Sequence, residues 1–383
     1  MNAQNILKDL VSFPILGGES NLEIVEYIKK YLQNFDIEYT LVPNKEGNKA
    51  SIHCRIGPST DGGFILSGHL DVVPVKGQAW DTEPFVLTEK SDGNLYGRGS
   101  CDMKGYLACC LVNLEKMTKA DLKKPIYLAF SYDEEIGCVG APELIDDILD
   151  HYTEKPKYAI IGEPSLMQPI VGQKGICVFK TTVHGSEGHS SMIKQEVSAI
   201  HEASKLINWL DSKMDALIKA GHIDNRFTPP HTSIHIGKIN GGVAPNVIAN
   251  QCIFYWDIRN IPQDNIEEIK NEFLDYCKER KDFLKTINPN FDIELTFDHP
   301  AVPALDTPEH LSIVPIIKNI SGNSQLSTVA YAAEAGQFSN AGLETVICGP
   351  GSIEQAHRAN EFISKEQLKK GVKMISDLID YLS

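Results

Sequence analysis

The sequence predicts an α/β protein with a mostly parallel sheet, interrupted by an inserted ferredoxin-like α+β domain. Short apolar runs alternate with helical stretches in the first half of the chain, which is typical of a parallel sheet covered on both faces. From about residue 175 the strands become half-exposed and their order changes. The 383 residues also exceed the size at which one core usually stops growing. We therefore expect a first domain over 1–174 and 300–383, and an inserted domain over 175–299.

The first domain is expected to contain three helices before the insertion. Apolar side chains at the helical period and an apolar stretch after a glycine-rich segment predict them over 20–35, Tyr106–Met117 and Ala141–Leu149. Bounded apolar runs predict strands, because such runs indicate buried strands of an α/β sheet. These strands are Glu38–Val42, Ala50–Arg55, Phe64–Leu66, Pro125–Phe130 and Tyr158–Ile161.

The inserted domain is expected to follow the order strand-helix-strand-strand-helix-strand, which is typical of ferredoxin-like folds. Its strands are Ile176–Val183, Ser233–Ile239, Cys252–Ile258 and Phe291–Phe297, and its helices are Ser198–Leu217 and Ile266–Phe283. From about Ala301 the first domain resumes. Its last elements are helices near Glu309–Ile320 and Lys365–Tyr381 and strands near Thr328–Ala330 and Glu344–Ile347.

Composition and charge exclude several classes of partner. The net charge of −15 argues against nucleic acid and against an anionic membrane. The segment Met1–Lys8 lacks the basic and apolar regions of a secretory signal, and no apolar run is long enough to span a bilayer. The nine cysteines are scattered without Cys-x-x-Cys spacing, so we expect reduced thiols, mostly in the core. These features predict a cytoplasmic protein.

The stretch Phe64–Pro74 contains the first candidate site. The apolar run Phe64–Leu66 ends in a small-residue turn, and His69 and Asp71 follow it. In open α/β sheets, functional residues lie beyond the carboxyl ends of such strands. At the extended period of two, both side chains point the same way, so one can bind a metal ion while the other orients it. For the pair alone, a histidine hydrogen-bonded to its neighbour at the core edge is the simpler interpretation.

Further acidic residues and a histidine stand at predicted strand ends or in loops. Taken singly, Asp102 could cap a helix, Glu134 and Glu135 could form a solvated turn, Glu163 could lie on the surface, and His357 could be a loop histidine. Taken together with His69, they form the ligand set expected for a carboxylate-rich dinuclear zinc or cobalt site. One carboxylate would bridge ions ~3.5–4 Å apart, as two-metal hydrolases require.

Four motifs occur in order along the chain. They are Ser-Gly-His-Leu-Asp-Val-Val-Pro, Gly-Arg-Gly-Ser-Cys-Asp-Met-Lys-Gly, Asp-Glu-Glu-Ile-Gly and Gly-Glu-Pro. Together they resemble the M20 metallopeptidase and deacylase family, and the resemblance covers essentially the whole chain. It implies a catalytic zinc-hydrolase domain that binds two divalent ions per subunit, with Zn²⁺ expected and Co²⁺ the alternative. The inserted domain would be a dimerisation domain or lid.

The resemblance also implies a role for each candidate ligand. His69 and Glu163 would bind one metal ion, and Glu135 and His357 would bind the other. Asp102 would bridge the two ions.

Two neighbouring carboxylates would serve these ligands. Asp71 would orient His69, and Glu134 would be the general base. A carboxylate held by a cation stays ionised, so Glu134, next to the ligand Glu135, must remain free to accept a proton. It would take that proton as a metal-bridging hydroxide attacks an amide carbonyl.

In the inserted domain, the resemblance points to residues that contact the substrate. His189, in the segment Gly185–Ser191, matches an oxyanion donor that in this family reaches the partner subunit, which implies a homodimer. Asn246 would assist the oxyanion, and Arg259 suits a bidentate clamp on a substrate carboxylate. Without the resemblance, His189 would be a polar loop histidine and Arg259 could instead pair with Asp257.

The expected substrate is a small N-acetylated amino acid. The segments Ala333–Phe338 and Gly349–His357 resemble those of family members that hydrolyse N-acetyl-L-ornithine to L-ornithine and acetate in arginine biosynthesis. The arginine that desuccinylases of the family carry in the first segment is missing here, and an acetyl group needs no such partner. Glu334 is predicted to pair with the side-chain amine of ornithine. The alternatives are a desuccinylase, a broad N-acyl-amino-acid hydrolase and a non-catalytic two-domain binding protein.

Overall fold

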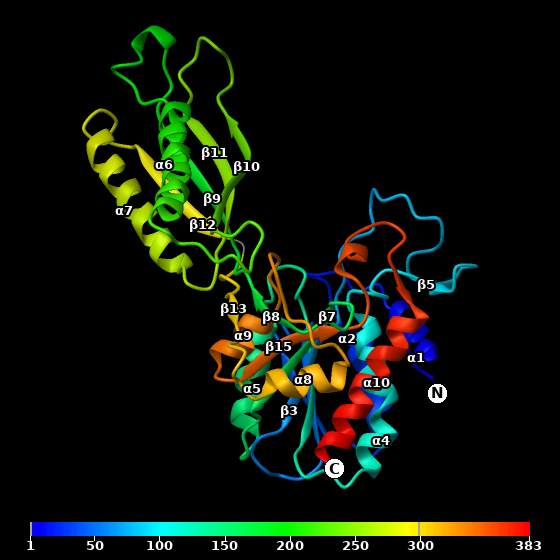
Figure 1. Cartoon of the computed structure of the whole chain (residues 1–383). Coiled ribbons are helices and arrows are strands. Elements are labelled where there is room, and N and C mark those ends of the chain that lie inside the picture. Colours follow the sequence, from blue (N-terminus) through cyan, green and yellow to red (C-terminus); the bar gives the residue numbers. More distant parts are fainter. Residues whose placement is uncertain (1, 298) are drawn as a thin grey trace. The chain divides into compact units, whose positions relative to one another are not determined.

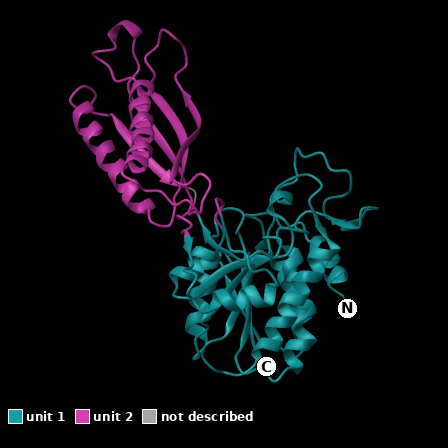
Figure 2. Ribbon diagram, in the orientation of Figure 1, with its two compact units in different colours: residues 1–173, 305–328, 333–383 teal, residues 174–304, 329–332 magenta. Residues whose placement is uncertain are grey.

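The computed structural model describes residues 2–297 and 299–383, which belong to two compact units (Figure 2). Unit 1 comprises residues 1–173, 305–328 and 333–383, and unit 2 comprises residues 174–304 and 329–332. The sequence predicts a return to the first domain at residue 300. In the structure, Ile176 pairs with Val302, and the Lys174 N–H donates to the Val329 carbonyl at 3.2 Å. These contacts hold residues 300–304 and 329–332 in unit 2.

Nine strands of the described residues form the sheet at the centre of unit 1 (Figure 1). Its order is β1-β2-β6-β3-β7-β15-β8-β13, and β14 also pairs with β8. The prediction of a parallel sheet is confirmed for the central strands β6, β3, β7 and β15, whereas the outer strands in this order pair antiparallel. The bounds are β1 (Tyr39–Pro43), β2 (Ala50–Ile56), β3 (Phe64–His69), β6 (Ile126–Ser131), β7 (Tyr158–Pro164), β8 (Ile170–Gln173), β13 (Leu305–Asp306), β14 (Ser327–Val329) and β15 (Glu344–Gly349).

Helices cover both faces of this sheet, as predicted. On one face α3 packs against β3 and β7 and is covered by α1 and α10, whereas α5 and α9 pack on the opposite face. The predicted helix Tyr106–Met117 is interrupted at Asn113, whose side-chain amide donates to the Cys109 carbonyl at 2.9 Å. The helices are α1 (Ala3–Val11), α2 (Leu22–Gln33), α3 (Lys104–Val112), α4 (Leu114–Lys119), α5 (Ala141–His151), α8 (Ile313–Ser321), α9 (Ala335–Asn340) and α10 (Lys365–Leu382).

The strand β3 extends beyond the predicted apolar run. Its residues 67–69 pair in register with residues 129–131 of β6, so the predicted small-residue turn before His69 is wrong. A Cβ on Gly68 would lie 2.7 Å from Cε of Met103 and 2.9 Å from Cδ2 of Leu107. The small residues therefore allow α3 to approach the strand closely, and His69 is the last residue of β3.

Unit 2 has the predicted ferredoxin-like order. Its four-stranded antiparallel sheet is arranged β10-β11-β9-β12, and α6 and α7 pack on it around one core. Phe179 stacks on Trp256, which meets Phe273 edge-on in this core. In chain order the elements are β9 (Cys177–His184), the 3₁₀ helix η1 (Ser190–Met192), α6 (Ala199–Lys219), β10 (Ser233–Gly241), β11 (Gln251–Arg259), α7 (Ile266–Leu284) and β12 (Asp292–Phe297).

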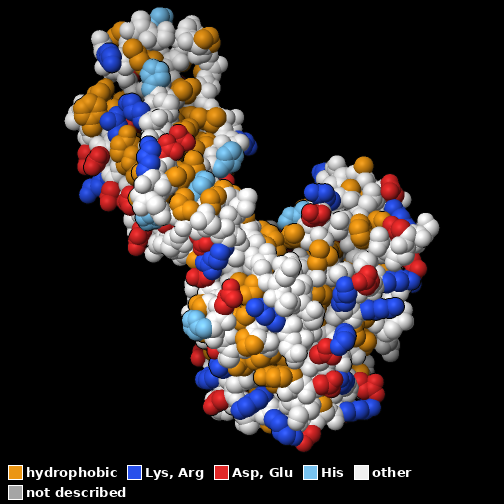
Figure 3. Space-filling model, in the orientation of Figure 1, with side chains coloured by type: hydrophobic (Ala, Val, Ile, Leu, Met, Phe, Trp, Pro, Cys, Tyr) orange, Lys and Arg blue, Asp and Glu red, His pale blue; other side chains and the backbone are white. Residues whose placement is uncertain are grey.

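Several surface and composition features bear on the partner predictions. On the face shown in Figure 3, basic and acidic side chains are interspersed over both units. Within the described residues, every helix is too short or too polar to cross a membrane.

All nine cysteines are free and buried, which confirms the prediction of core thiols.

Candidate metal centre

The candidate ligands of unit 1 lie beyond or at the carboxyl ends of the four parallel strands. His69 ends β3, Glu163 is the second-last residue of β7, Glu135 follows β6, and His357 follows β15. Because parallel strands end at one edge of the sheet, residues far apart in sequence meet there. Asp102 joins them from the loop that precedes α3.

Asp102 lies between the two histidines. Its Oδ1 is 3.0 Å from Nε2 of His69, and its Oδ2 is 3.5 Å from Nε2 of His357. On the first side Glu163 Oε1 is 3.7 Å from His69 Nε2, and on the second Glu135 Oε2 is 3.0 Å from His357 Nε2. Asp102 therefore has an imidazole and a further carboxylate on each side, and Glu135 also lies close enough to His69 and Asp102 to offer a donor atom to the first side.

The ring of His69 is held in a definite orientation. Its Nδ1 is 2.9 Å from the Asp71 carbonyl oxygen, and since a carbonyl can only accept, Nδ1 carries the proton. Nε2 faces Asp102, at 3.0 Å, and Glu163, and in the metal-free protein it donates its proton to the Asp102 carboxylate. A metal ion that replaced this proton would meet the Nε2 lone pair of a correctly oriented ring.

Asp71 thus orients His69 through its main chain, because its carboxylate Oδ1 lies 3.7 Å from His69 Nδ1. The two carboxylate oxygens instead accept the N–H groups of Glu134 and Glu135, each at 3.1 Å. The side chain of Asp71 therefore fixes the acidic turn that follows β6.

The loop that carries Asp102 is organised by Glu361, which is not among the residues predicted from the sequence. The Glu361 carboxylate accepts the N–H groups of Gly99, Cys101 and Asp102 at 2.9 to 3.0 Å and forms a 2.7 Å ion pair with Arg98. Both side chains of this pair are 1% exposed. Glu361 precedes β16 (Phe362–Ser364), which pairs with β5 (Asn94–Tyr96) and through it with β4 (Thr88–Glu89). In the sequence, Glu361 could have been selected as a candidate only because it lies four residues after His357.

The electrostatics of the centre favour cations. Burial raises the pKa of the Glu134 and Glu163 carboxyls well above the usual range and also raises that of Glu135. Burial acts in the same direction on Asp102, but the neighbouring imidazoles of His357 and His69 hold its pKa below the usual value. The Asp102 and Glu135 carboxylates raise the pKa of His357 to about 10.

This donor set fits divalent metal ions. Five carboxyl groups, those of Asp71, Asp102, Glu134, Glu135 and Glu163, gather around two imidazoles. Several buried carboxylates are costly unless cations balance them, and mixed imidazole and carboxylate donors suit zinc and cobalt. Glu134 also lies close enough to His69 and Glu163 to offer a donor atom, so geometry alone does not separate a ligand from a base at this position.

In unit 2, His189 and Asn246 lie on paired segments. His189 bridges to Val247, and the Ser190 N–H donates to the Asn246 carbonyl at 3.1 Å. The Ser191 N–H donates to Nδ1 of His189 at 3.3 Å, so the proton of the neutral ring lies on Nε2. His189 is exposed and therefore presents an N–H donor to its surroundings.

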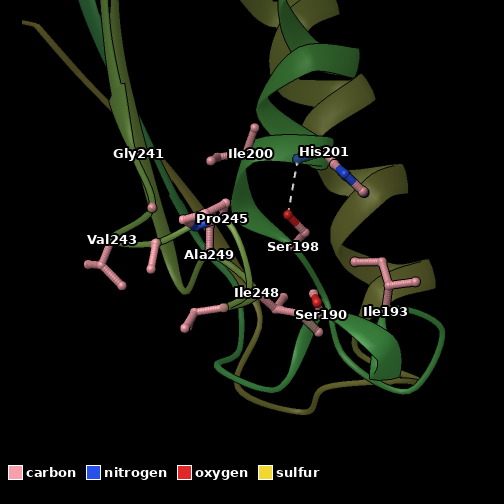
Figure 4. Close-up of a pocket in the computed structure, with 13 residues that line it drawn as sticks. Ser190, Ile193, Ser198, Ile200, His201, Gly241, Val243, Pro245, Ile248 and Ala249 are labelled. Carbon is pink, nitrogen blue, oxygen red and sulfur yellow. Dashed lines mark hydrogen bonds between the residues drawn. The ribbon is translucent and has the colours of Figure 1, made fainter.

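The same two segments border a pocket of about 640 Å³, shown in Figure 4. Ser190, Ser198 and His201 line it on one side, and the 241–249 loop lines it on the other. Val243, in this loop, is 80% exposed.

Two predicted substrate contacts have other partners in the structure. Arg259 lies 3.4 Å from Asp257, so the alternative of a strand-end salt bridge is the contact that the structure contains. Glu334 is 1% exposed and accepts hydrogen bonds from Ser67, at 3.2 Å, and from Ser131. A buried carboxylate engaged by two hydroxyls does not suit a substrate amine, which argues against the predicted pairing of Glu334 with ornithine.

Comparison with known proteins decides the family. Residues 65–381 match the model of Peptidase family M20/M25/M40. The chain belongs to this family.

A relative of named activity aligns with nearly the full length of this chain. The chain is 32% identical over 386 aligned positions to the acetylornithine deacetylase of Shigella sonnei, covering 98% of this chain and 96% of that protein.

Two solved structures share the fold of this chain. A tripeptidase from Staphylococcus aureus superposes with a TM-score of 0.75 at 21% identity, covering 100% of this chain and 98% of the other. A dinuclear metal-binding M20 peptidase from Bacillus subtilis superposes with a TM-score of 0.65 at 15% identity, covering 99% and 97%.

Proposed function

We propose that this M20 hydrolase converts N-acetyl-L-ornithine and water to L-ornithine and acetate. The observation that carries the proposal is the pair of donor clusters that share Asp102 in unit 1. The similarity to an acetylornithine deacetylase along nearly the whole chain supports the choice of substrate. The absence of an arginine from residues 333–338 supports it further, because a succinyl carboxylate would need such a partner.

Two divalent ions complete the proposed site, with Zn²⁺ expected and Co²⁺ the alternative. His69 and Glu163 would hold one ion, and Glu135 and His357 the other, with Asp102 in contact with both. Ions bound there polarise a substrate carbonyl and lower the pKa of a water molecule.

Glu134 is the proposed general base. It removes a proton from the attacking water and returns it to the amine nitrogen of the departing ornithine. Burial raises the pKa of this carboxyl well above its usual range, which makes its carboxylate a better proton acceptor. Asp71 holds the Glu134 N–H and so keeps the base at the edge of the centre.

The inserted domain would supply the remaining contacts. His189, through its Nε2–H, and Asn246, through its side-chain amide, would donate to the developing oxyanion. Arg259 would bind the substrate carboxylate by exchanging its Asp257 contact.

We propose that His189 serves the partner's site in a cytoplasmic homodimer. The exposed second half of the edge strand β10 supports an interface, because Ile239 is 50% exposed and an unpaired edge favours strand pairing.

Steady-state rates with zinc or cobalt added test the substrate assignment. N-acetylornithine, N-acetylmethionine and N-succinyl-diaminopimelate would be compared by kcat/KM, with Glu134→Gln as the matched inactive control. We expect N-acetylornithine to be preferred at least roughly tenfold, which corresponds to about 1.4 kcal/mol. Equal rates on the two acetylated substrates would indicate a broad deacylase, and preference for the succinylated one would indicate a desuccinylase.

A further inference from the structure

The turn that carries Glu134 contains a thiol in contact with its carboxylate. Cys138 Sγ lies 3.3 Å from Glu134 Oε1, a distance at which a thiol donates a hydrogen bond. Cys138 is 3% exposed, so water does not compete for this contact. Among the hydrogen bonds found in residues 2–297 and 299–383, this is the one that reaches the Glu134 carboxylate.

The backbone brings the thiol to this place. Gly137 and Cys138 both donate their N–H groups to the Glu134 carbonyl, at 2.9 and 2.8 Å, and both adopt positive φ, +117° and +52°. The tight turn folds residue 138 back over residue 134. Gln337 of α9 donates to the Cys138 carbonyl at 3.1 Å and holds the turn from outside. These contacts use the main chain, so they persist when the thiol is replaced.

We propose that Cys138 is a positioning residue that anchors one oxygen of Glu134, so that the other oxygen faces the water and the leaving amine. This inference rests on the proposed role of Glu134 as general base. A free glutamate side chain has three rotatable bonds, and a base must be held within hydrogen-bond reach of the proton that it abstracts. The thiol fixes Oε1 and leaves Oε2 for proton transfer.

The chemistry of a thiol suits this task better than that of a stronger donor. A lysine or arginine beside Glu134 would stabilise its charged form and weaken it as a base. A thiol is a weak donor, and burial raises the pKa of Cys138 well above its usual range, so the S–H proton remains in place. The bond is also kept when Oε2 takes up a proton, because Oε1 can still accept. Cys138 therefore positions the base throughout the proton transfer.

The S–H stretching band in the infrared tests the contact directly, whatever the substrate is. The band of Cys138 is the one that disappears in the difference between the wild-type protein and Cys138→Ala. We expect Glu134→Ala to move this band to higher frequency, because it removes the acceptor, and to leave the bands of the other cysteines in place. An unshifted Cys138 band would overturn the proposal.

Kinetics with saturating metal test the consequence. We expect Cys138→Ala to lower kcat roughly 3- to 10-fold, as for loss of one hydrogen bond, with KM within about twofold. Cys138→Ser, which restores a donor, should recover part of the loss. The matched control is Cys54→Ala, which truncates another buried thiol in β2 and should leave kcat unchanged.

Metal content separates positioning from a structural role. Bound metal in Cys138→Ala should equal that of the wild-type protein. Loss of metal, an increase in KM without a change in kcat, or no recovery in Cys138→Ser would contradict a positioning role. If no tested amide is hydrolysed by the wild-type protein, the proposed function fails while the infrared result still decides the Cys138 contact.

Discussion

The two halves of the candidate metal centre differ in how the fold holds them. In the half formed by His69 and Glu163, the side chains are 1% and 6% exposed, and both residues belong to central parallel strands. In the other half, Glu135 is 5% exposed but His357 is 59% exposed. His357 lies in a loop, adopts φ of +61°, and is held through its carbonyl by Gln78 at 2.8 Å.

The sheet therefore positions the ligands of one half, and loops position those of the other. A ligand on a buried strand is held in place by its neighbours, whereas a ligand on a loop is held by a few contacts. The buried half should therefore bind its ion first and keep it longest. Metal binding in the open half, formed by Glu135 and His357, should depend more strongly on pH and on the conformation of the loop around residue 357.

The largest expected effect comes from Glu134, which is proposed to serve both halves without holding either ion. Glu134→Ala should lower kcat roughly 10²–10⁴-fold, as expected for loss of a general base. Its bound metal, measured by elemental analysis, should match that of the wild-type protein. Near-normal turnover would remove Glu134 from the role of base, and loss of one ion would make it a ligand.

A sharper test of the comparison replaces one histidine in each half. His69→Ala leaves the buried Glu163 carboxylate without its imidazole partner and leaves Asp102 with His357 alone, and the metal-free protein should lose about 3–5 kcal/mol of unfolding free energy. His357→Ala removes a side chain that is 59% exposed, so water screens the partners left behind and the loss should be smaller than in His69→Ala. Urea unfolding without metal measures both values. Equal losses would contradict the distinction between the halves.

The same pair predicts different metal stoichiometries. His357→Ala should retain one tightly bound ion per subunit, because His69 and Glu163 remain. His69→Ala should lose the buried ion and weaken the second, since Asp102 is shared. Titration with zinc, followed by elemental analysis after gel filtration, distinguishes these outcomes. One retained ion in His69→Ala and none in His357→Ala would reverse the assignment of the halves.

The smallest effect concerns pH. In the metal-free protein the pKa of His357 is raised to about 10, above its unfolded value, so its contribution to stability is full below about pH 6.5 and is lost as the pH rises through about 10. Metal binding removes this proton, so the ion in the open half should bind more tightly as pH rises from 7 to 9. Calorimetry in buffers of different ionisation enthalpy measures the released proton. A pH-independent affinity would contradict this account.

The main elements of the fold could be predicted from the sequence because apolar periodicity governs strands and helices that bury one or both faces. The position of His69 at the end of a central strand followed from such a run, and so did that of Glu163. The length of β3 could not be predicted, because a glycine after an apolar run usually signals a turn. Gly68 instead makes room for α3, which packs on the strand and follows it by more than 30 residues in the sequence.

The supporting residues could not be predicted because their partners are distant in sequence. Glu361 organises a loop more than 250 residues earlier, and Glu334 accepts a hydrogen bond from Ser67, which lies 267 residues earlier in β3. Cys138 is only four residues from Glu134, but its contact depends on positive φ values, and only Gly137 signals these in the sequence. Motifs indicate candidate ligands, whereas the contacts that orient them appear only in three dimensions.

The central claim is that five side chains hold two ions around a shared carboxylate. A crystal structure of the zinc-loaded protein, with anomalous data at the zinc edge, tests it most directly. The account predicts two peaks, one in contact with His69 and Glu163 and the other with Glu135 and His357, both touching Asp102. A single peak at full zinc occupancy, or a pair of peaks that does not share Asp102, would contradict it.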